Sequence, residues 1–116
     1  MSGVITVEAS GLLIAWTVEQ GGGELRLLLH PGGVAVFDAE RLIPISVDGA
    51  YENTGFVDGD AAVFDLASGH RLRLLVGRKL GVIPLIGLEL QVYARRALGL
   101  GWRWLFSVRR SVEVVA

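Results

Sequence analysis

Turn-forming residues recur at a nearly regular spacing along this chain, and that spacing constrains the fold more than any other feature. Seven short glycine-containing clusters are present, and most of them are roughly ten residues apart. This distance fits one strand followed by a tight turn. The pattern predicts a meander of β-hairpins. The clusters are Ser10-Gly11, Gly21 to Gly23, Pro31 to Gly33, Asp48-Gly49, Asp58-Gly59, Ser68-Gly69 and Gly99 to Gly101.

The segments between these turns alternate in polarity. In residues 24–30 Leu25, Leu27 and Leu29 share one parity, and residues 70–77 alternate in the same way. A period of two is typical of strands with one buried face. We therefore predict an all-β fold, a small barrel or sandwich. The expected strands lie near residues 3–9, 12–19, 24–30, 34–38, 41–47, 61–67, 70–77, 82–94 and 102–114.

One segment also fits a helix. Apolar residues between Leu85 and Leu98 recur at helical spacing, so the alternative fold is a β-sheet capped by one helix near 85–98, as in pleckstrin-homology-like domains. The strand interpretation is favoured because Leu88, Leu90 and Val92 alternate regularly with polar neighbours.

Length and composition indicate one domain over residues 1–116 with a surplus of apolar side chains. A chain of this length has enough surface to bury for a single core. Hydrophobic residues make up 52% of it and the mean hydropathy is +0.52, so some apolar side chains are expected to stay at the surface. We expect a homo-oligomer or another protein partner to cover them.

The inventory of residues excludes several kinds of site. There is no cysteine, which rules out disulfides and thiolate chemistry within the chain. The net charge of -1 argues against general binding of polyanions. Arginine outnumbers lysine ten to one, a bias that fits a thermophilic or GC-rich source.

Two segments of the sequence bear on where in the cell the protein is expected. The longest uncharged apolar run, Leu80 to Leu88, is too short for a transmembrane helix, so we expect no transmembrane segment. The N-terminal segment lacks the basic region of a signal peptide and contains Glu8 and Ser10. A cytoplasmic protein is therefore expected.

No motif for catalysis, metal binding or a cofactor is present, so we expect neither a metal nor a cofactor. The two histidines, His30 and His70, are not spaced as a metal-binding pair. Asp58 and Asp60 resemble the start of a calcium loop, but the next ligand positions are apolar. An enzymatic or ligand-binding barrel stays open as an alternative, with polar groups such as His30, His70 or Asp38 meeting in a pocket.

The segment from Arg95 to Arg110 contains five arginines and two tryptophans. Paired with the preceding strand so that partner numbers sum to 198, it predicts a hairpin whose inner row holds Trp104, Phe106 and Val108. In this register Arg109 faces Glu89.

The remaining arginines of this segment, apart from Arg110, are expected at the tip of the hairpin. The same register places Arg95 opposite Arg103, and Arg96 opposite Trp102 within reach of a cation–π contact. The candidate binding residues at the tip are therefore Arg95, Arg96, Trp102 and Arg103.

Arg110 interrupts the apolar row between Val108 and Val112. A charge in such a row has to find a partner or reach solvent. We expect Arg110 either to be partly buried and bonded to a carboxylate, or to mark the point where the strand enters a subunit interface, and it is the fifth candidate binding residue.

These features favour a non-catalytic interaction or scaffold module that self-associates. The alternative is a small nucleic-acid-binding barrel that uses the arginine and tryptophan tip.

Overall fold

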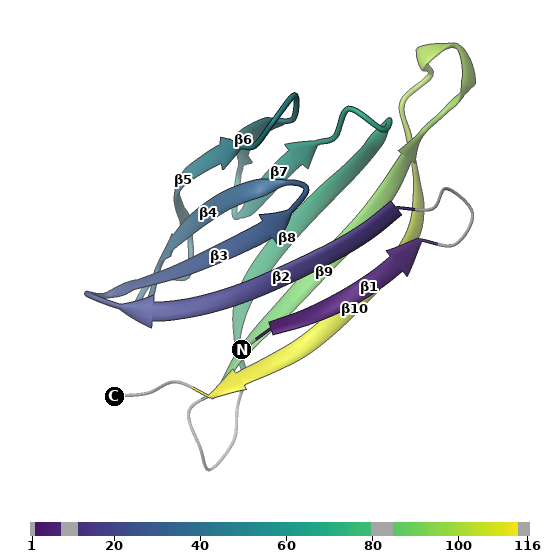
Figure 1. The fold of residues 1–116 in the computed structure, drawn as a ribbon. Coiled ribbons are helices and arrows are strands. Elements are labelled where there is room, and N and C mark those ends of the chain that lie inside the picture. Colours follow the sequence, from purple (N-terminus) through teal and green to yellow (C-terminus); the bar gives the residue numbers. More distant parts are fainter. Residues whose placement is uncertain (1, 8–11, 80–84, 114–116) are drawn as a thin grey trace.

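The computed structural model describes residues 2–7, 12–79 and 85–113, and nearly all of them lie in antiparallel strands (Figure 1). One 3₁₀ turn, η2 (Ala97–Gly99), joins the last two strands. The strands are β1 (Ser2–Val7), β2 (Leu12–Gly21), β3 (Glu24–His30), β4 (Gly33–Asp38), β5 (Pro44–Gly49), β6 (Thr54–Asp58), β7 (Ala61–Asp65), β8 (His70–Lys79), β9 (Leu85–Arg95) and β10 (Trp102–Glu113).

The strands form two five-stranded sheets that follow the chain order. The first sheet has the order β1-β2-β3-β4-β5 and the second the order β10-β9-β8-β7-β6. Figure 1 shows the purple and blue strands of the first sheet lying across the teal, green and yellow strands of the second. The predicted all-β meander is therefore confirmed, in the form of a sandwich.

Two glycines bring the sheets together where β5 meets β6. A Cβ atom on Gly49 would collide with the backbone of Asn53, and one on Gly55 would lie 2.7 Å from the amide nitrogen of Gly49. Only glycine allows so close a backbone approach. At the opposite side, β1 and β10 are the end strands of two separate sheets in the described ranges, so the sheets form an open sandwich and not a closed barrel.

The helical alternative for residues 85–98 is wrong. Leu85–Arg95 is strand β9, which is hydrogen-bonded on both sides, to β8 and to β10. Its alternate residues Leu88, Leu90 and Val92 are buried, because they face the first sheet. Pairing with two neighbouring strands satisfies the backbone N–H and C=O groups of β9. This segment is therefore a strand, although its apolar residues also recur at helical spacing.

The strand prediction missed β6, and β5 begins later than expected. β6 is a short edge strand whose only large apolar residues, Phe56 and Val57, are adjacent, so it shows no alternation. Ahead of β5, the Asp38 carboxylate accepts hydrogen bonds from the backbone N–H groups of Arg41 (2.7 Å) and Glu40 (2.9 Å), and these lower the pKa of Asp38. This turn occupies the first residues of the expected strand 41–47. The outer parts of the expected strands 3–9, 82–94 and 102–114 lie outside the described residues.

The core lies between the two sheets and draws on both of them. Phe37 of the first sheet and Phe64 of the second are fully buried. The inward positions of the central strands follow the predicted alternation. The largest buried side chains of this shared core are Phe37, Phe64, Ile14, Leu25, Leu27, Leu72 and Val92.

His70 is the buried polar residue of the described core, and it makes stability depend on pH. Burial lowers the pKa of His70 from its ordinary value of 6.5, and Ser68 Oγ lies 3.0 Å from its Nδ1. The unfolded chain therefore binds a proton more readily than the folded one, so the free energy of unfolding falls as the pH drops below 6.5.

Urea unfolding on both sides of that pH measures this effect. His70→Asn should flatten the dependence in this window, because it removes the buried imidazole. An unchanged slope in His70→Asn would refute the assignment.

No helix in the described ranges 2–7, 12–79 and 85–113 is long and apolar enough to cross a membrane.

Candidate interaction surface

The β9–β10 hairpin follows the predicted register along most of its length. Phe106 pairs with Val92, Val108 with Leu90, and Arg109 with Glu89. The Arg109 guanidinium binds the Glu89 carboxylate, with Nε and Nη2 both 3.0 Å from Oε1. Phe106 and Val108 are partly buried and pack against the core as predicted.

A bulge between Trp104 and Phe106 shifts the register by one residue toward the tip. Trp104 consequently pairs with Tyr93 instead of Ala94, and lies on the outer face of the second sheet, the face turned away from the first sheet. Its side chain is 57% exposed, so the prediction that Trp104 packs in the core is wrong. Alternation alone does not reveal where a strand gains an extra residue.

The shift changes the partners of Trp102. Trp102 pairs with Arg95, and its ring contacts two guanidinium groups, that of Arg71 at 4.4 Å and that of Arg95 at 5.3 Å. The expected pairing of Trp102 with Arg96 is therefore wrong. A tryptophan between two arginines gains a cation–π contact from each.

Arg71 is the central residue of this arrangement. Its Nε and Nη2 donate to the two carboxylate oxygens of Asp65 at 2.5 and 2.9 Å, and the hydrogen bonding raises the pKa of Arg71. Its guanidinium also lies 5.4 Å from the ring of Phe56. A bidentate ion pair between neighbouring strands holds the guanidinium in one orientation beneath Trp102.

The same bulge places Arg103 and Arg95 on different faces of the hairpin. Arg103 pairs with Ala94 and, lying between Trp102 and Trp104 on the strand, projects to the other face, so the expected pair of Arg95 with Arg103 is wrong. Arg96 directly precedes η2. Arg95, Arg96 and Arg103 are exposed, and no described carboxylate lies within salt-bridge distance of them.

Beside Trp102 the outer face contains a shallow hollow that the sequence did not indicate. The Arg73 guanidinium lies at its wall, with Nη2 4.0 Å from Asp58 and a buried Nε that has no hydrogen-bond partner. The alternation of Arg71 and Arg73 in β8 was visible in the sequence, but the proximity of β8 to Trp102 was not. The residues that line the hollow are Asp58, Val63, Arg71, Arg73, Tyr93 and Trp102.

Hydrogen bonds between side chains order the rest of this face. The Tyr93 hydroxyl donates to Gln91 Oε1 at 3.0 Å, and Gln91 Nε2 donates to Glu89 Oε2 at 3.2 Å. The Trp104 indole N–H donates to Ser107 Oγ at 3.0 Å, which fixes the exposed ring. We call Arg71, Arg95, Trp102 and Trp104 the arginine–tryptophan face.

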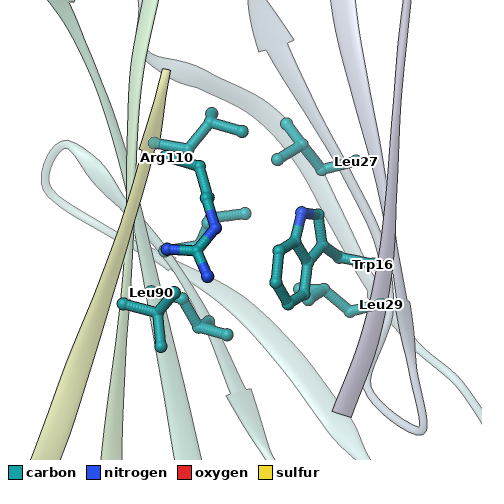
Figure 2. Close-up of a pocket in the computed structure, with 8 residues that line it drawn as sticks. Trp16, Leu27, Leu29, Leu90 and Arg110 are labelled. Atoms are coloured by element: carbon teal, nitrogen blue, oxygen red, sulfur yellow. The ribbon is translucent and has the colours of Figure 1, made fainter. Parts of the chain in front are cut away.

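Arg110 is not placed as expected. Its side chain is exposed, its Nη1 donates to the backbone carbonyl of Arg109 at 2.7 Å, and no described carboxylate binds it. The prediction of a partly buried Arg110 bonded to a carboxylate is therefore wrong. Its guanidinium instead lies 5.8 Å from the ring of Trp16, which belongs to the other sheet (Figure 2).

The polar residues of the enzymatic alternative have separate, local partners. His30 meets the ring of Tyr51 edge-on, His70 contacts Ser68, and Asp38 caps its own turn. Within the part of the chain that the structure describes, no three histidine, aspartate or glutamate residues are grouped as for a metal ion. The polar side chains that do lie together are those of the arginine–tryptophan face and the adjoining hollow.

Comparisons of the chain with known family models, with curated proteins and with solved structures find no match.

Proposed function

We propose that this chain is a non-catalytic interaction module that self-associates through the β9–β10 hairpin. The observation that carries the proposal is the apolar surface of that hairpin, where Leu98 is 94% exposed, Leu100 72% and Trp104 57%. Exposed apolar side chains that lie close together are typical of protein interfaces.

The edge of β10 supports the same proposal. This 12-residue strand is the outermost strand of the second sheet, in which it is paired with β9. The outer edge of an end strand can offer backbone N–H and C=O groups to another strand. A second copy is the proposed partner, because the edge and the apolar tip adjoin each other on one hairpin.

The molar mass of the protein in solution tests self-association. Light scattering over a range of concentrations should give at least twice the 12.5 kDa of one chain. Trp104→Ser should weaken association by about tenfold or more, as expected when an interface tryptophan is truncated. Ile45→Ser is the matched control, since Ile45 is 53% exposed but lies on β5. A monomeric wild type, or equal loss in both variants, would contradict the proposal.

A second candidate function is binding of single-stranded nucleic acid. The observation that favours it is the arginine–tryptophan face, in which two guanidinium groups flank Trp102 and the exposed ring of Trp104 lies on the same side of the sheet. Bases stack on such rings while arginines contact phosphates.

Anisotropy of labelled oligothymidine over a salt series tests this candidate. Affinity should fall steeply with salt. In a plot of the logarithm of the association constant against the logarithm of the salt concentration, Arg95→Ala should make the slope shallower by about 0.7, the contribution of one phosphate contact on a single strand. Arg103→Ala is the control, because Arg103 projects to the other face of the same hairpin. Absence of binding at low salt, or an equal effect of Arg103→Ala, would remove nucleic acid as a ligand.

A further inference from the structure

The end of the β9–β10 hairpin extends beyond the rest of the second sheet. The last residue pair between β8 and β9 joins His70 to Ala94, and residues 96–101 lie past it. Within this turn the backbone N–H of Arg96 donates to the carbonyl of Gly101 at 2.9 Å. Figure 1 shows the turn, in light green, projecting past the neighbouring strands. Residues 96–101 therefore form a separate tip, and we call them the hairpin tip.

The hairpin tip carries two leucines that the fold does not bury. Leu98 is 94% exposed and Leu100 72%, and η2 contains no buried residue. Leu98 also has a φ of +61°, a left-handed conformation that is uncommon for residues other than glycine. Neither burial nor backbone conformation favours leucine at this position, so its side chain is better explained by a contact outside the chain.

The charged residues that flank these leucines on the hairpin are all arginines. Arg95 and Arg96 precede the leucines, Arg103 follows them, and all three are exposed. The sequence has no acidic residue from position 90 to position 112, and no described carboxylate lies within salt-bridge distance of the three arginines. The hairpin tip therefore combines exposed apolar side chains with positive charge that no described carboxylate neutralises.

Two tryptophans follow the hairpin tip on β10. The ring of Trp102 contacts the Arg95 guanidinium at 5.3 Å, and Trp104 is 57% exposed with its indole N–H bonded to Ser107. Tryptophan is enriched where a membrane meets water, because it joins an apolar ring to a polar N–H group. Leucines that enter the acyl chains, with arginines and tryptophans at the headgroups, are typical of interfacial membrane anchors.

We propose that the hairpin tip docks on a membrane that contains anionic phospholipids, with Leu98 and Leu100 among the acyl chains and the arginines on the lipid phosphates. An anionic bilayer supplies the charge that the arginines lack. Two copies that met tip to tip would instead bring their arginines together, and a nucleic acid would leave the leucines in water. The proposal goes beyond self-association, since a second copy paired along the edge of β10 can leave the hairpin tip free.

Flotation of the full chain with vesicles on a density gradient tests the proposal. Vesicles of equimolar phosphatidylcholine and phosphatidylserine should carry the protein upward, and vesicles of pure phosphatidylcholine should bind it about tenfold more weakly or less, because they lack the anionic charge. The double variant Leu98→Ser, Leu100→Ser should weaken binding to the anionic vesicles by about tenfold or more, since it removes the apolar side chains that leave water.

The matched control for the leucines is the double variant Ile43→Ser, Ile45→Ser. It removes two exposed isoleucines at the start of β5, on the other sheet, and should leave vesicle binding unchanged. No binding to anionic vesicles, or equal loss in the two double variants, would overturn the proposal. So would binding to vesicles and to oligothymidine that is unaffected by removal of the leucines, because it would indicate a site for anions in general.

Substitution of single arginines tests the charge. Arg96→Gln should weaken binding to anionic vesicles by about fivefold, the contribution of one arginine near a charged lipid surface. Arg109→Gln changes the net charge equally, but Arg109 binds Glu89 away from the hairpin tip, so this variant should bind like the wild type. Equal effects of the two substitutions would contradict the proposal.

Light scattering without lipid separates this proposal from self-association. A monomer that floats with anionic vesicles would contradict self-association and support the membrane contact. An oligomer that does not float would support self-association and overturn the membrane contact.

Discussion

Phe64→Ala is expected to lower the free energy of unfolding by about 3–5 kcal/mol, because it leaves a cavity at the centre of the core. Phe64 is 0% exposed and lies on β7, which is paired on both sides, with β6 and with β8. Neighbouring strands held by two ladders have little freedom to collapse into the space. The loss is comparable with the entire stability of many small domains.

Denaturant unfolding followed by circular dichroism measures this loss. Val57→Ala on the adjacent strand β6 is the control, since Val57 is 48% exposed, and it should change the free energy of unfolding by about 0.5 kcal/mol or less. If both substitutions cost the same, the burial of Phe64 between the sheets would be wrong.

Gly33→Ala is expected to cost about 3 kcal/mol or more, from backbone strain and steric overlap together. Gly33 has a φ of +138°, which side-chain-bearing residues rarely adopt, and a Cβ there would collide with the carbonyl oxygen of Asp48 on β5. The pairing of Gly33 with Gly49 would have to open, and β5 is the strand that adjoins the second sheet through β6.

Gly21→Ala provides the comparison. Gly21 lies at the end of β2, where a Cβ would meet nothing within 4 Å, so the substitution should be neutral or stabilise by up to about 1 kcal/mol. Thermal melts of the two variants are sufficient to separate these outcomes. A Gly33→Ala protein as stable as Gly21→Ala would show that β4 and β5 are not paired as described.

The sequence predicted some of the contacts of the β9–β10 hairpin but not all of them. The pairing of Arg109 with Glu89 followed from the alternation, because both residues lie beyond the bulge and keep the simple register. Trp104 was assigned to the wrong face because one extra residue in β10 reverses the faces of every residue before it. Arg71 was not recognised as a neighbour of Trp102, since the two residues are far apart in the chain.

The sequence by itself determined the local structure of the chain, that is, the positions of most strands. Turn residues and a period of two predict where most strands lie and which side chains alternate along an uninterrupted strand, because both depend on near neighbours in the chain. Nine of the ten strands follow from it, and the exception is β6, whose large apolar residues Phe56 and Val57 are adjacent and show no alternation.

The tertiary structure alone decided which edges meet and which stay open. Glycines 49 and 55 allow β5 to approach β6, while β1 and β10 are the end strands of two separate sheets in the described ranges, and this asymmetry creates a crevice in which Trp16 faces Arg110. Those two residues are 94 positions apart, and only the packing of one sheet on the other places a cation against that ring. Such contacts depend on the geometry of the whole sandwich, which no local pattern encodes.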